Sequence, residues 1–273
     1  MSKAPKTTVV LACYNGEDFL HKLLFLLSHE PCEVVAVDDN SRDGTWQILD
    51  QYDFVRKLRN NQNKGFAVVN NLGGFLADTK YILFLNQDTE PEPRFIKAME
   101  ERMEATPECA VVGAKLIFPV SSIRHIVLGE RPHVLTRIAG RLDSAGIDLN
   151  QQFLPYEVGR NNHPDIPVFN VAKMWPAVTG ACMLIKRKAF GELGGFYEDF
   201  INGWEDTDLC LRAWELGYQV WYTPEAVVMH YHSTSDARFV NEDANIDLWV
   251  KRWFTEERIE RLVGKYRKEW EEQ

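Results

Sequence analysis

A regular alternation of strand and helix patterns in the first half of the chain is the feature that most constrains its fold. Apolar β runs at Thr7–Cys13 and Glu33–Val37 alternate with helical patterns at Glu17–Ser28 and Gly44–Gln51. Such alternation predicts parallel βαβ units, because a crossover helix must join two parallel strands. The sequence therefore predicts an α/β fold with a Rossmann-like, mostly parallel central sheet that is flanked by helices.

Polar residues follow two of the predicted buried strands. The apolar run Tyr81–Leu85, after a helical pattern at Lys64–Ala77, is typical of a strand buried on both faces. Ligands of open α/β sheets bind at the carboxyl ends of the strands. The polar residues directly after this strand and after the strand at Glu33–Val37 are Asp38, Asp39, Asn86, Gln87 and Asp88.

The stretch from Phe118 to Pro167 loses the strand and helix periodicity. It follows a predicted helix near Pro93 and a strand at Ala110–Ile117, and it is rich in Gly, Pro, His, Arg and Asn. It is too long for an ordinary loop in a compact domain. We expect a functional lid or a segment that shapes an acceptor site, and a surface insertion is the alternative.

Regular patterns resume in the last third of the chain. A strand at Met183–Ile185, a turn at Gly194-Gly195, a helix at Glu205–Leu216 and a short strand at Gln219–Tyr222 are predicted. Because the chain contains neither an internal repeat nor a low-complexity linker, we expect one domain over residues 1–240.

The pattern of residues 241–273 predicts a charged, helical C-terminal extension. We expect its apolar stripe to pack on the same domain or on a second copy, which would give a homodimer. Docking on a membrane surface is a further alternative, which the mixture of acidic and basic residues disfavours. The apolar members of the stripe are Ile246, Trp249, Trp253, Ile259 and Leu262.

Charge and composition exclude several classes of protein. The formal net charge of −9 argues against nucleic acid as a partner, because phosphates need a basic surface. The five cysteines show no zinc spacing, which indicates free thiols in a reducing compartment. No run reaches the roughly 20 apolar residues of a membrane-spanning helix, and the N-terminus has no signal-peptide pattern. We expect a soluble, cytoplasmic protein.

Acidic side chains at the two strand ends suit a nucleotide and a metal. Asp38 and Asp39 can accept hydrogen bonds from a ribose or a base edge, and turn formation with helix capping is the alternative. Asp88 can offer an oxygen to a hard divalent cation that binds two phosphates, and an ordinary polar strand end is the alternative.

A third acidic group begins a predicted helix beside Trp204. Asp206 precedes Leu209 by three positions, so we expect it to face the buried side as a general base. Glu205 and Asp208 are expected to turn outward, with Asp208 in an i,i+4 ion pair. The alternative is that these acids only complement a helix N-terminus.

His230 is the histidine that we single out among the seven in the chain. It follows the apolar run Ala226–Met229 and so ends a predicted strand, where other site residues can converge. Neutral imidazole is a ligand for transition metals such as manganese. A structural role is the alternative.

Several motifs occur in a fixed order along the chain. They are Cys13-Tyr14-Asn15, Asp38-Asp39-Asn40-Ser41-Arg42-Asp43-Gly44-Thr45, Asn63-Lys64-Gly65-Phe66, Asn86-Gln87-Asp88, Thr179-Gly180-Ala181-Cys182, Gly194-Gly195-Phe196, Glu205-Asp206-Thr207-Asp208-Leu209 with Arg212, and His230. In this combination the chain, over roughly residues 7–235, resembles the family 2 glycosyltransferases of the GT-A fold. The branch that it resembles most is the rhamnosyltransferase-like enzymes of bacterial surface-polysaccharide assembly.

The resemblance implies a nucleotide-binding half at 1–117 and an acceptor-binding half at 118–240. The metal motif maps onto Asn86-Gln87-Asp88, where Asn86 replaces the usual first Asp and leaves Asp88 as the anionic ligand. His230 matches a histidine that completes the site for Mn²⁺ or Mg²⁺ in some relatives. By resemblance, the residues that hold the donor are Ala12, Tyr14, Asp38, Asp39, Lys64, Gly65, Asn86 and Gln87.

The resemblance also implies transfer with inversion from a UDP- or dTDP-sugar to a glycan or lipid-linked acceptor. Asp206 matches the catalytic base, with Glu205 as the alternate, and inversion needs this base opposite the leaving diphosphate. Thr179, Gly180 and Trp204 match the pocket for the donor sugar and the acceptor. Such acceptors imply peripheral action at the inner face of the cell membrane.

Three other functions remain open from the sequence. A sugar-nucleotide pyrophosphorylase would carry a Gly-rich phosphate loop with Arg and Lys where this chain has Cys13-Tyr14-Asn15-Gly16-Glu17. A glycoside hydrolase would need two carboxylates but no nucleotide pocket. A non-catalytic protein that binds nucleotide sugars would not need both Asp88 and Asp206.

Overall fold

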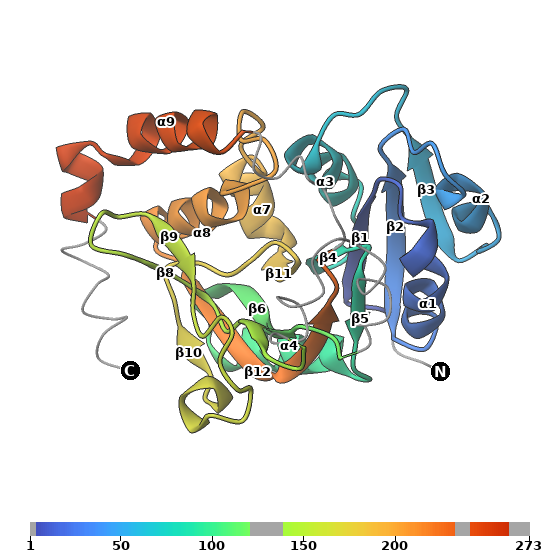
Figure 1. Cartoon of the computed structure of the whole chain (residues 1–273), viewed down its shortest axis with the longest axis horizontal. Helices are drawn as coiled ribbons and strands as arrows, with labels where there is room; N and C mark the ends of the chain where they lie inside the picture. Colours follow the sequence, from blue (N-terminus) through green and yellow to red (C-terminus); the bar gives the residue numbers. More distant parts are fainter. Residues whose placement is uncertain (1–3, 121–138, 233–240, 262–273) are drawn as a thin grey trace.

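A mixed β-sheet forms the centre of the structure (Figure 1). The computed structural model describes residues 4–120, 139–232 and 241–261. Within these ranges, ten strands form the sheet, in the order β10-β12-β6-β11-β4-β1-β2-β3, with β5 beside β12 and β7 beside β6. The predicted α/β class with a central sheet and flanking helices is confirmed. Four of the nine strand pairings of this sheet in the described ranges are parallel, and they include all three in its first half.

The first half of the sheet follows the predicted βαβ pattern. Strands β1 (Thr7–Cys13), β2 (Cys32–Asp38), β3 (Val55–Arg59) and β4 (Tyr81–Asn86) all pair in parallel. Strand β3 was not predicted. It lies at the edge of the sheet, where the sequence Val55-Arg56-Lys57-Leu58-Arg59 needs no continuous apolar run.

One antiparallel strand interrupts the second half of the sheet. Strand β11 (Cys182–Lys186) pairs antiparallel with both β4 and β6 (Cys109–Ile117), whereas β12 (Gln219–His230) pairs in parallel with β6. Strand β12 joins the predicted strand at Gln219–Tyr222 to the predicted strand that ends at His230. An irregularity between Thr223 and Val227 lets the pairing with β6 continue to Met229, and His230 pairs with Thr89 of β5.

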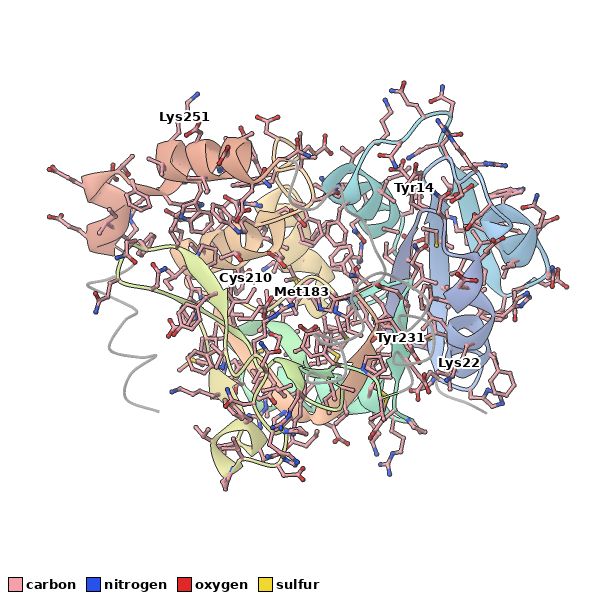
Figure 2. All side chains as sticks on the ribbon, viewed as in Figure 1. Tyr14, Lys22, Met183, Cys210, Tyr231 and Lys251 are labelled. Carbon is pink, nitrogen blue, oxygen red and sulfur yellow. The ribbon has the colours of Figure 1, made fainter. Side chains whose placement is uncertain are left out.

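Helices cover both faces of the sheet. One face carries α1 (Glu17–Leu27), α2 (Thr45–Asp50) and α4 (Phe95–Ala105), and the other carries α3 (Phe66–Phe75), α7 (Arg187–Leu193) and α8 (Glu205–Glu215). Successive residues of β1 supply the two cores, since Leu11 packs under the first set and Val10 under the second. Met183 of β11 and Cys210 of α8 meet in the second core (Figure 2).

The aperiodic stretch of the sequence contains short strands. Strand β7 (Leu142–Ser144) extends the sheet beside β6, and β8 (Ile147–Leu149) forms a hairpin with β9 (Pro155–Glu157). Residues 121–138 of this stretch lie outside the described ranges. The remaining short elements are β5 (Thr89–Pro91), the 3₁₀ helix η1 (Pro167–Asn170) and β10 (Lys173–Met174).

The C-terminal helix α9 (Glu242–Trp253) packs on its own chain, above α8 (Figure 1). Trp249 and Trp253 are fully buried, and the Trp249 ring contacts Trp204 with centroids 5.5 Å apart. The two largest residues of the predicted stripe are thus used within the chain, and Leu262 lies outside the described residues. No helix in the described ranges combines the length and the apolar character needed to cross a bilayer.

Gly73 and Gly191 form a matched pair that tests the helix packing. A Cβ on Gly73 of α3 would lie 2.4 Å from Val10 Cγ1 of β1, whereas one on Gly191 of α7 would meet no described atom within 4 Å. Gly73→Ala is expected to lower the free energy of unfolding by about 1–3 kcal/mol through overpacking. Gly191→Ala is expected to raise it by about 0.4–1 kcal/mol, because alanine restricts the unfolded chain. Urea unfolding measures both, and equal effects would contradict the packing of α3 on β1.

Candidate active site

Asp39 holds the segment that leads into helix α3. Its Oδ2 accepts hydrogen bonds from the backbone amides of Lys64 and Gly65 at 2.8 and 2.9 Å, and its Oδ1 accepts one from Asn60 Nδ2 at 2.8 Å. Gly65 has a φ of +85°, which favours glycine. Three of the residues that were predicted to hold the donor therefore lie together at the N-terminal end of α3.

Asp38 is tied to the loop that follows β2. It is fully buried, its Oδ1 accepts a hydrogen bond from Ser41 N at 3.0 Å, and its Oδ2 lies 2.9 Å from Arg59 Nε. The Arg59 guanidinium also stacks on Trp46. These contacts favour the turn-forming alternative for Asp38 over a direct contact with a nucleotide.

Gln87 joins the ends of β1 and β4. Its Oε1 accepts a hydrogen bond from Tyr14 N at 3.0 Å, and its Nε2 donates one to Tyr14 O at 2.7 Å. Ala12 of β1 pairs with Asn86 of β4 in the parallel register. The ring of Tyr14 is 41% exposed, so it is open to a ligand at this end of the sheet (Figure 2).

Asn86, Asp88 and His230 meet where β4 and β12 end. His230 Nε2 lies 3.6 Å from Asp88 Oδ1 and 3.3 Å from Asn86 Nδ2. Asp88 and His230 are each 6% exposed. A carboxylate oxygen and an imidazole nitrogen thus converge, and this donor set suits Mn²⁺ or Mg²⁺.

Asp143 supports His230 from the other side of the imidazole ring. Its Oδ2 lies 2.9 Å from His230 Nδ1 and 2.6 Å from His232 Nε2, and its Oδ1 lies 3.2 Å from Arg160. Ligand atoms of Asp143, His230 and His232 lie within 4.8 Å of one another. A carboxylate on Nδ1 fixes the ring and leaves Nε2 to face Asp88, as second partners of metal-bound histidines do.

Opposing effects act on the charge of His230. Burial disfavours its protonated form, but Asp88 and the hydrogen bond to Asp143 outweigh burial and raise the pKa of His230 to about 10. Burial and the nearby charge of His230 lower the pKa of His232. In this structure the imidazolium of His230 therefore lies between two carboxylates, where a cation is electrostatically favoured.

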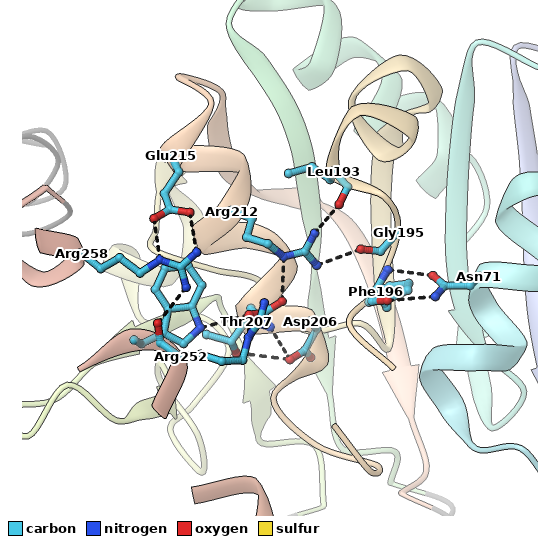
Figure 3. Close-up of polar contacts among 12 residues, drawn as sticks. Asn71, Leu193, Gly195, Phe196, Asp206, Thr207, Arg212, Glu215, Arg252 and Arg258 are labelled. Carbon is cyan, nitrogen blue, oxygen red and sulfur yellow. Dashed lines mark hydrogen bonds and ion pairs between the residues drawn. The ribbon is translucent and has the colours of Figure 1, made fainter. Parts of the chain in front are cut away.

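Asp206 lies at the first turn of α8 and contacts the segment before β11. Its Oδ2 accepts a hydrogen bond from Gly180 N at 2.8 Å. Its Oδ1 accepts one from Thr207 N at 2.6 Å (Figure 3). A Cβ on Gly180 would lie 3.3 Å from Asp206 Cβ and 3.2 Å from Phe66. Gly180 thus lets the start of α3 and the start of α8 approach each other, with Thr179 directly before it.

The predicted orientation of the acids on α8 is wrong. Asp206 is partly exposed, whereas Glu205 and Asp208, which were expected to turn outward, are 5% and 0% exposed. Asp208 is buried because two cations reach it: Arg212 Nε at 2.8 Å, as the i,i+4 pairing predicted, and Arg252 Nε of α9 at 2.9 Å. Glu205 Oε2 accepts a hydrogen bond from Gly203 N.

A short backbone path joins Asp206 to the metal residues. Gly180 N donates to Asp206, and the carbonyl of the next residue, Ala181, accepts a hydrogen bond from Asn86 N at 2.9 Å. Asn86 in turn contacts His230. The residues predicted as base and as metal ligands therefore lie in one region of the structure.

Glu157 has a buried carboxylate oxygen, and it was not among the predicted site residues. The residue is partly exposed, but its Oε2 is buried and has no hydrogen-bond partner among the described residues. Burial and the Asp143 carboxylate, with a smaller contribution from Asp206, raise the pKa of Glu157 to about 8. Glu157 and Asp143 come from the aperiodic stretch, so this stretch contributes to the site. No local pattern in the sequence indicates either residue.

The family model described as Glycosyl transferase family 2 matches residues 8–194. The chain belongs to this family. A second model, the N-terminal domain of galactosyltransferase, matches residues 161–233, which include Asp206 and His230. The predicted family is thus confirmed, which argues against the pyrophosphorylase and glycoside hydrolase alternatives.

Two curated bacterial relatives resemble most of the chain. The O-antigen biosynthesis protein RfbC of Myxococcus xanthus is 29% identical over 90% of this chain, which spans only 19% of that protein. The N-acetylglucosaminyl-diphospho-decaprenol L-rhamnosyltransferase of Mycobacterium tuberculosis is 26% identical over 84% of this chain and 77% of its own length. Both names agree with the predicted branch of the family.

A solved glycosyltransferase structure shares the fold. GalNAc-T7, in a crystal structure with UDP, GalNAc and Mn²⁺, superposes with a TM-score of 0.68 at 17% identity, over 97% of this chain and 51% of its own. This similarity confirms the predicted GT-A fold.

The raised pKa of Glu157 predicts a pH-dependent stability. The folded state keeps this proton up to about pH 8, whereas the unfolded state releases it near the ordinary value of 4.5. The free energy of unfolding should therefore fall as pH rises between these values, by up to about 1.4 kcal/mol per pH unit. Glu157→Gln removes this contribution, so the variant should gain stability relative to the unmodified chain from pH 5 to pH 8 in urea unfolding. The exposed strand residue Glu33, changed to Gln, is the control, and parallel pH profiles for all three proteins would refute the burial of a neutral Glu157.

Proposed function

We propose that this chain is an inverting glycosyltransferase that moves a sugar from a nucleoside-diphosphate donor to a hydroxyl of a glycan or lipid-linked acceptor. The observation that carries the proposal is the backbone path from Asp206 through Gly180 and Ala181 to Asn86 and His230. A base and a metal site that lie in one region can act on opposite sides of one reacting carbon, as a single displacement requires.

The nucleotide half of the donor is assigned to the ends of β1 and β2 and the start of α3, within residues 1–117. Helix α3 begins at Phe66, whose amide donates to Asn202, and the positive end of this helix suits a diphosphate. Lys64 is exposed beside it and adds a positive charge. Asp39 holds Lys64 and Gly65 through its two oxygens, so the segment is preformed. The exposed ring of Tyr14 can cover a base, and UDP or dTDP is the expected carrier.

A divalent ion, Mn²⁺ or Mg²⁺, is assigned to Asp88 and His230. The residues fit such an ion, because Asp88 is an oxygen ligand, His230 offers Nε2, and Asp143 orients the imidazole through Nδ1. When bound, the ion would offset the charge that develops on the leaving diphosphate. Asn86, which replaces an acidic residue of the usual motif, keeps its amide for the donor or for His230.

Asp206 is assigned as the base, with Glu205 as its neighbour in the same turn. Asp206 removes the proton of the acceptor hydroxyl while the new bond to the anomeric carbon forms and the bond to the diphosphate breaks. The amides of Gly180 and Thr207 orient the carboxylate. Glu205 is 5% exposed and accepts the Gly203 amide, so it supports the turn rather than competing for the proton.

The acceptor is assigned to residues 118–240, beside Thr179, Trp204 and the β8–β9 hairpin. The names of the two bacterial relatives, which concern O-antigen and a decaprenol-linked sugar, support an acceptor in surface-polysaccharide synthesis. A lipid-linked acceptor would bring the enzyme to the inner face of the cell membrane. Residues 241–273 form the helical extension in this assignment.

A donor screen tests the proposed reaction. Purified chain, Mn²⁺ and a lipid-linked glycan acceptor are mixed with each of several UDP- and dTDP-sugars, and one class of donor is expected to release nucleoside diphosphate as its sugar passes to the acceptor hydroxyl. Asp206→Asn should lower this turnover by more than about 100-fold, because it removes general base catalysis while keeping the size of the side chain. One of the two amides that Asp206 accepts, from Gly180 or Thr207, loses its acceptor in this variant. Donor affinity, measured by calorimetry, should stay within about threefold, since Asp206 acts on the acceptor. Asp247→Asn, an exposed residue of α9, is the control. Full turnover in Asp206→Asn would rule out this base.

Mn²⁺ binding tests the support that Asp143 gives to His230. Asp143→Ala should weaken Mn²⁺ affinity by about 10–100-fold in the presence of nucleoside diphosphate, because the imidazole loses the contact that orients it. Asp88→Ala should weaken it further, since it removes a ligand. Electron paramagnetic resonance of free Mn²⁺ measures both. Asp165→Ala, an exposed acid from the same stretch of chain, should bind Mn²⁺ normally. Unchanged affinity in Asp143→Ala would show that His230 does not need Asp143 to bind metal.

A further inference from the structure

Helix α9 holds the loop that precedes the base through one buried side chain, Asn245. Its Oδ1 accepts a hydrogen bond from Ile201 N at 3.1 Å, and its Nδ2 donates to Ile201 O at 3.0 Å and to Gly203 O at 3.2 Å. Asn245 is 4% exposed. The side-chain amide thus binds the main chain of residues 201–203, which lie 42 to 44 positions before Asn245 in the sequence.

The loop that Asn245 binds has a strained backbone. Asn202 and Trp204 have φ values of +52° and +71°, in the left-handed region that bulky side chains rarely adopt. Such a conformation persists only when the surroundings hold it. Asn245 makes three hydrogen bonds in all, two to Ile201 and one to Gly203, which are the neighbours of Asn202. The Trp204 ring packs on Trp249, which lies on α9 with Asn245.

The same loop lies between the donor segment and the base. Asn202 Oδ1 accepts a hydrogen bond from Phe66 N at 3.4 Å, and Phe66 is the first residue of α3. At its other end, the Gly203 amide donates to Glu205 Oε2 at 2.7 Å, one residue before Asp206. A shift of this loop would therefore move Asp206 relative to the start of α3.

A second set of contacts joins α9 to the body of α8. Asp208 Oδ1 accepts hydrogen bonds from Arg252 Nε at 2.9 Å and Trp253 Nε1 at 3.1 Å, and its Oδ2 accepts one from Arg212 Nε at 2.8 Å. Arg212 extends this network to the carbonyls of Leu193 and Gly195 (Figure 3). Helix α9 is thus docked by buried tryptophans and by Asp208, independently of Asn245.

We propose that α9 is a positioning element of the active site, in which Asn245 sets the Ile201–Gly203 loop and thereby the placement of Asp206 against the donor segment. The proposal rests on the assigned role of Asp206 as base. A displacement of a reacting group by about 1 Å can lower the rate on the order of 100-fold. Loss of the three hydrogen bonds that hold this loop can therefore change the rate through a small shift of Asp206. Asn245 is not one of the residues assigned to the donor, the metal or the acceptor, so it acts through the loop.

Docking and positioning can be separated by mutation. Trp249, Trp253 and Asp208 hold α9 on α8, whereas every described hydrogen bond of the Asn245 side chain goes to the 201–203 loop. Asn245→Ala should therefore free the loop and leave the helix docked. Trp253→Ala should instead undock the helix, and so it provides the comparison for a structural defect.

The experiment compares Asn245→Ala with Lys251→Ala in the full chain. Lys251 is exposed on the same helix and points away from the body (Figure 2). Asn245→Ala is expected to lower kcat by about 10-fold, with donor Kd within about threefold, because the chemical step needs the geometry that ground-state binding does not. Amide hydrogen exchange of residues 201–206 should become faster in this variant and stay unchanged in Lys251→Ala. Asn245→Asp keeps the acceptor for Ile201 N but turns a carboxylate oxygen towards the carbonyls of Ile201 and Gly203, so its kcat should be no higher than that of Asn245→Ala.

Two results would overturn the proposal. One is an Asn245→Ala variant with unchanged kcat and unchanged exchange in residues 201–206. The other is that both Asn245→Ala and Asn245→Asp lose donor binding, kcat and thermal stability together, as Trp253→Ala does. Asn245 would then be a purely structural residue. Exchange and donor binding do not depend on the identity of the base. Faster exchange in Asn245→Ala together with full turnover in Asp206→Asn would therefore reject the base while the positioning of the loop stands.

Discussion

The antiparallel insertion of β11 between β4 and β6 is the constraint on which the site depends. Because β11 runs antiparallel to its neighbours, its first residues lie beside the carboxyl end of β4, with Cys182 opposite Leu85. The residues just before β11, Thr179 to Ala181, therefore lie beside Asn86 and meet Asp206. Strand β12 runs parallel to β6 and brings His230 to the same edge. A fully parallel sheet would need a long crossover before β11 and would place its start at the opposite edge.

The elements predicted well are those whose signal is local. Strands β1, β2 and β4 each contain a continuous apolar run because both of their faces are covered, and such runs stand out in a sequence. Strand β3 was missed because it is an edge strand with three basic residues among its five. Strand β12 was predicted as two pieces because Pro224 and an irregular pairing interrupt its pattern. Helix α7 is only seven residues long, less than two full turns, and its apolar periodicity cannot be distinguished over that length. What the sequence lacked in each case was knowledge of the neighbouring strand or helix.

The same distinction explains the site. Asp88, Asp206 and His230 could be proposed as site residues from the sequence, because each follows or begins a regular element and the order of the motifs could be compared with a family. Asp143 could not be found, since its partner His230 is 87 positions away and no pattern surrounds it. The orientation of Asp208 was predicted wrongly for a related reason. A buried carboxylate is unfavourable unless cations reach it, and one of its two cations, Arg252, comes from a helix 44 positions later. Charge compensation across long sequence separations is invisible to periodicity.

The concentration of acids around the site has a further consequence for how donor and metal would bind. Asp88, Asp143, Glu157 and Asp206 lie in one region of a chain whose net charge is −9, and two of these carboxylates are offset by the imidazolium of His230. A diphosphate adds negative charge to this region, and the exposed Lys64 with the N-terminal end of α3 offsets part of it. A divalent cation bound to Asp88 and His230 Nε2 would replace the proton on His230 Nε2. It would thus put two positive charges beside these carboxylates in place of one. Donor and metal should therefore favour each other's binding, which offsets the weaker metal affinity that Asn86 causes by replacing an acidic ligand.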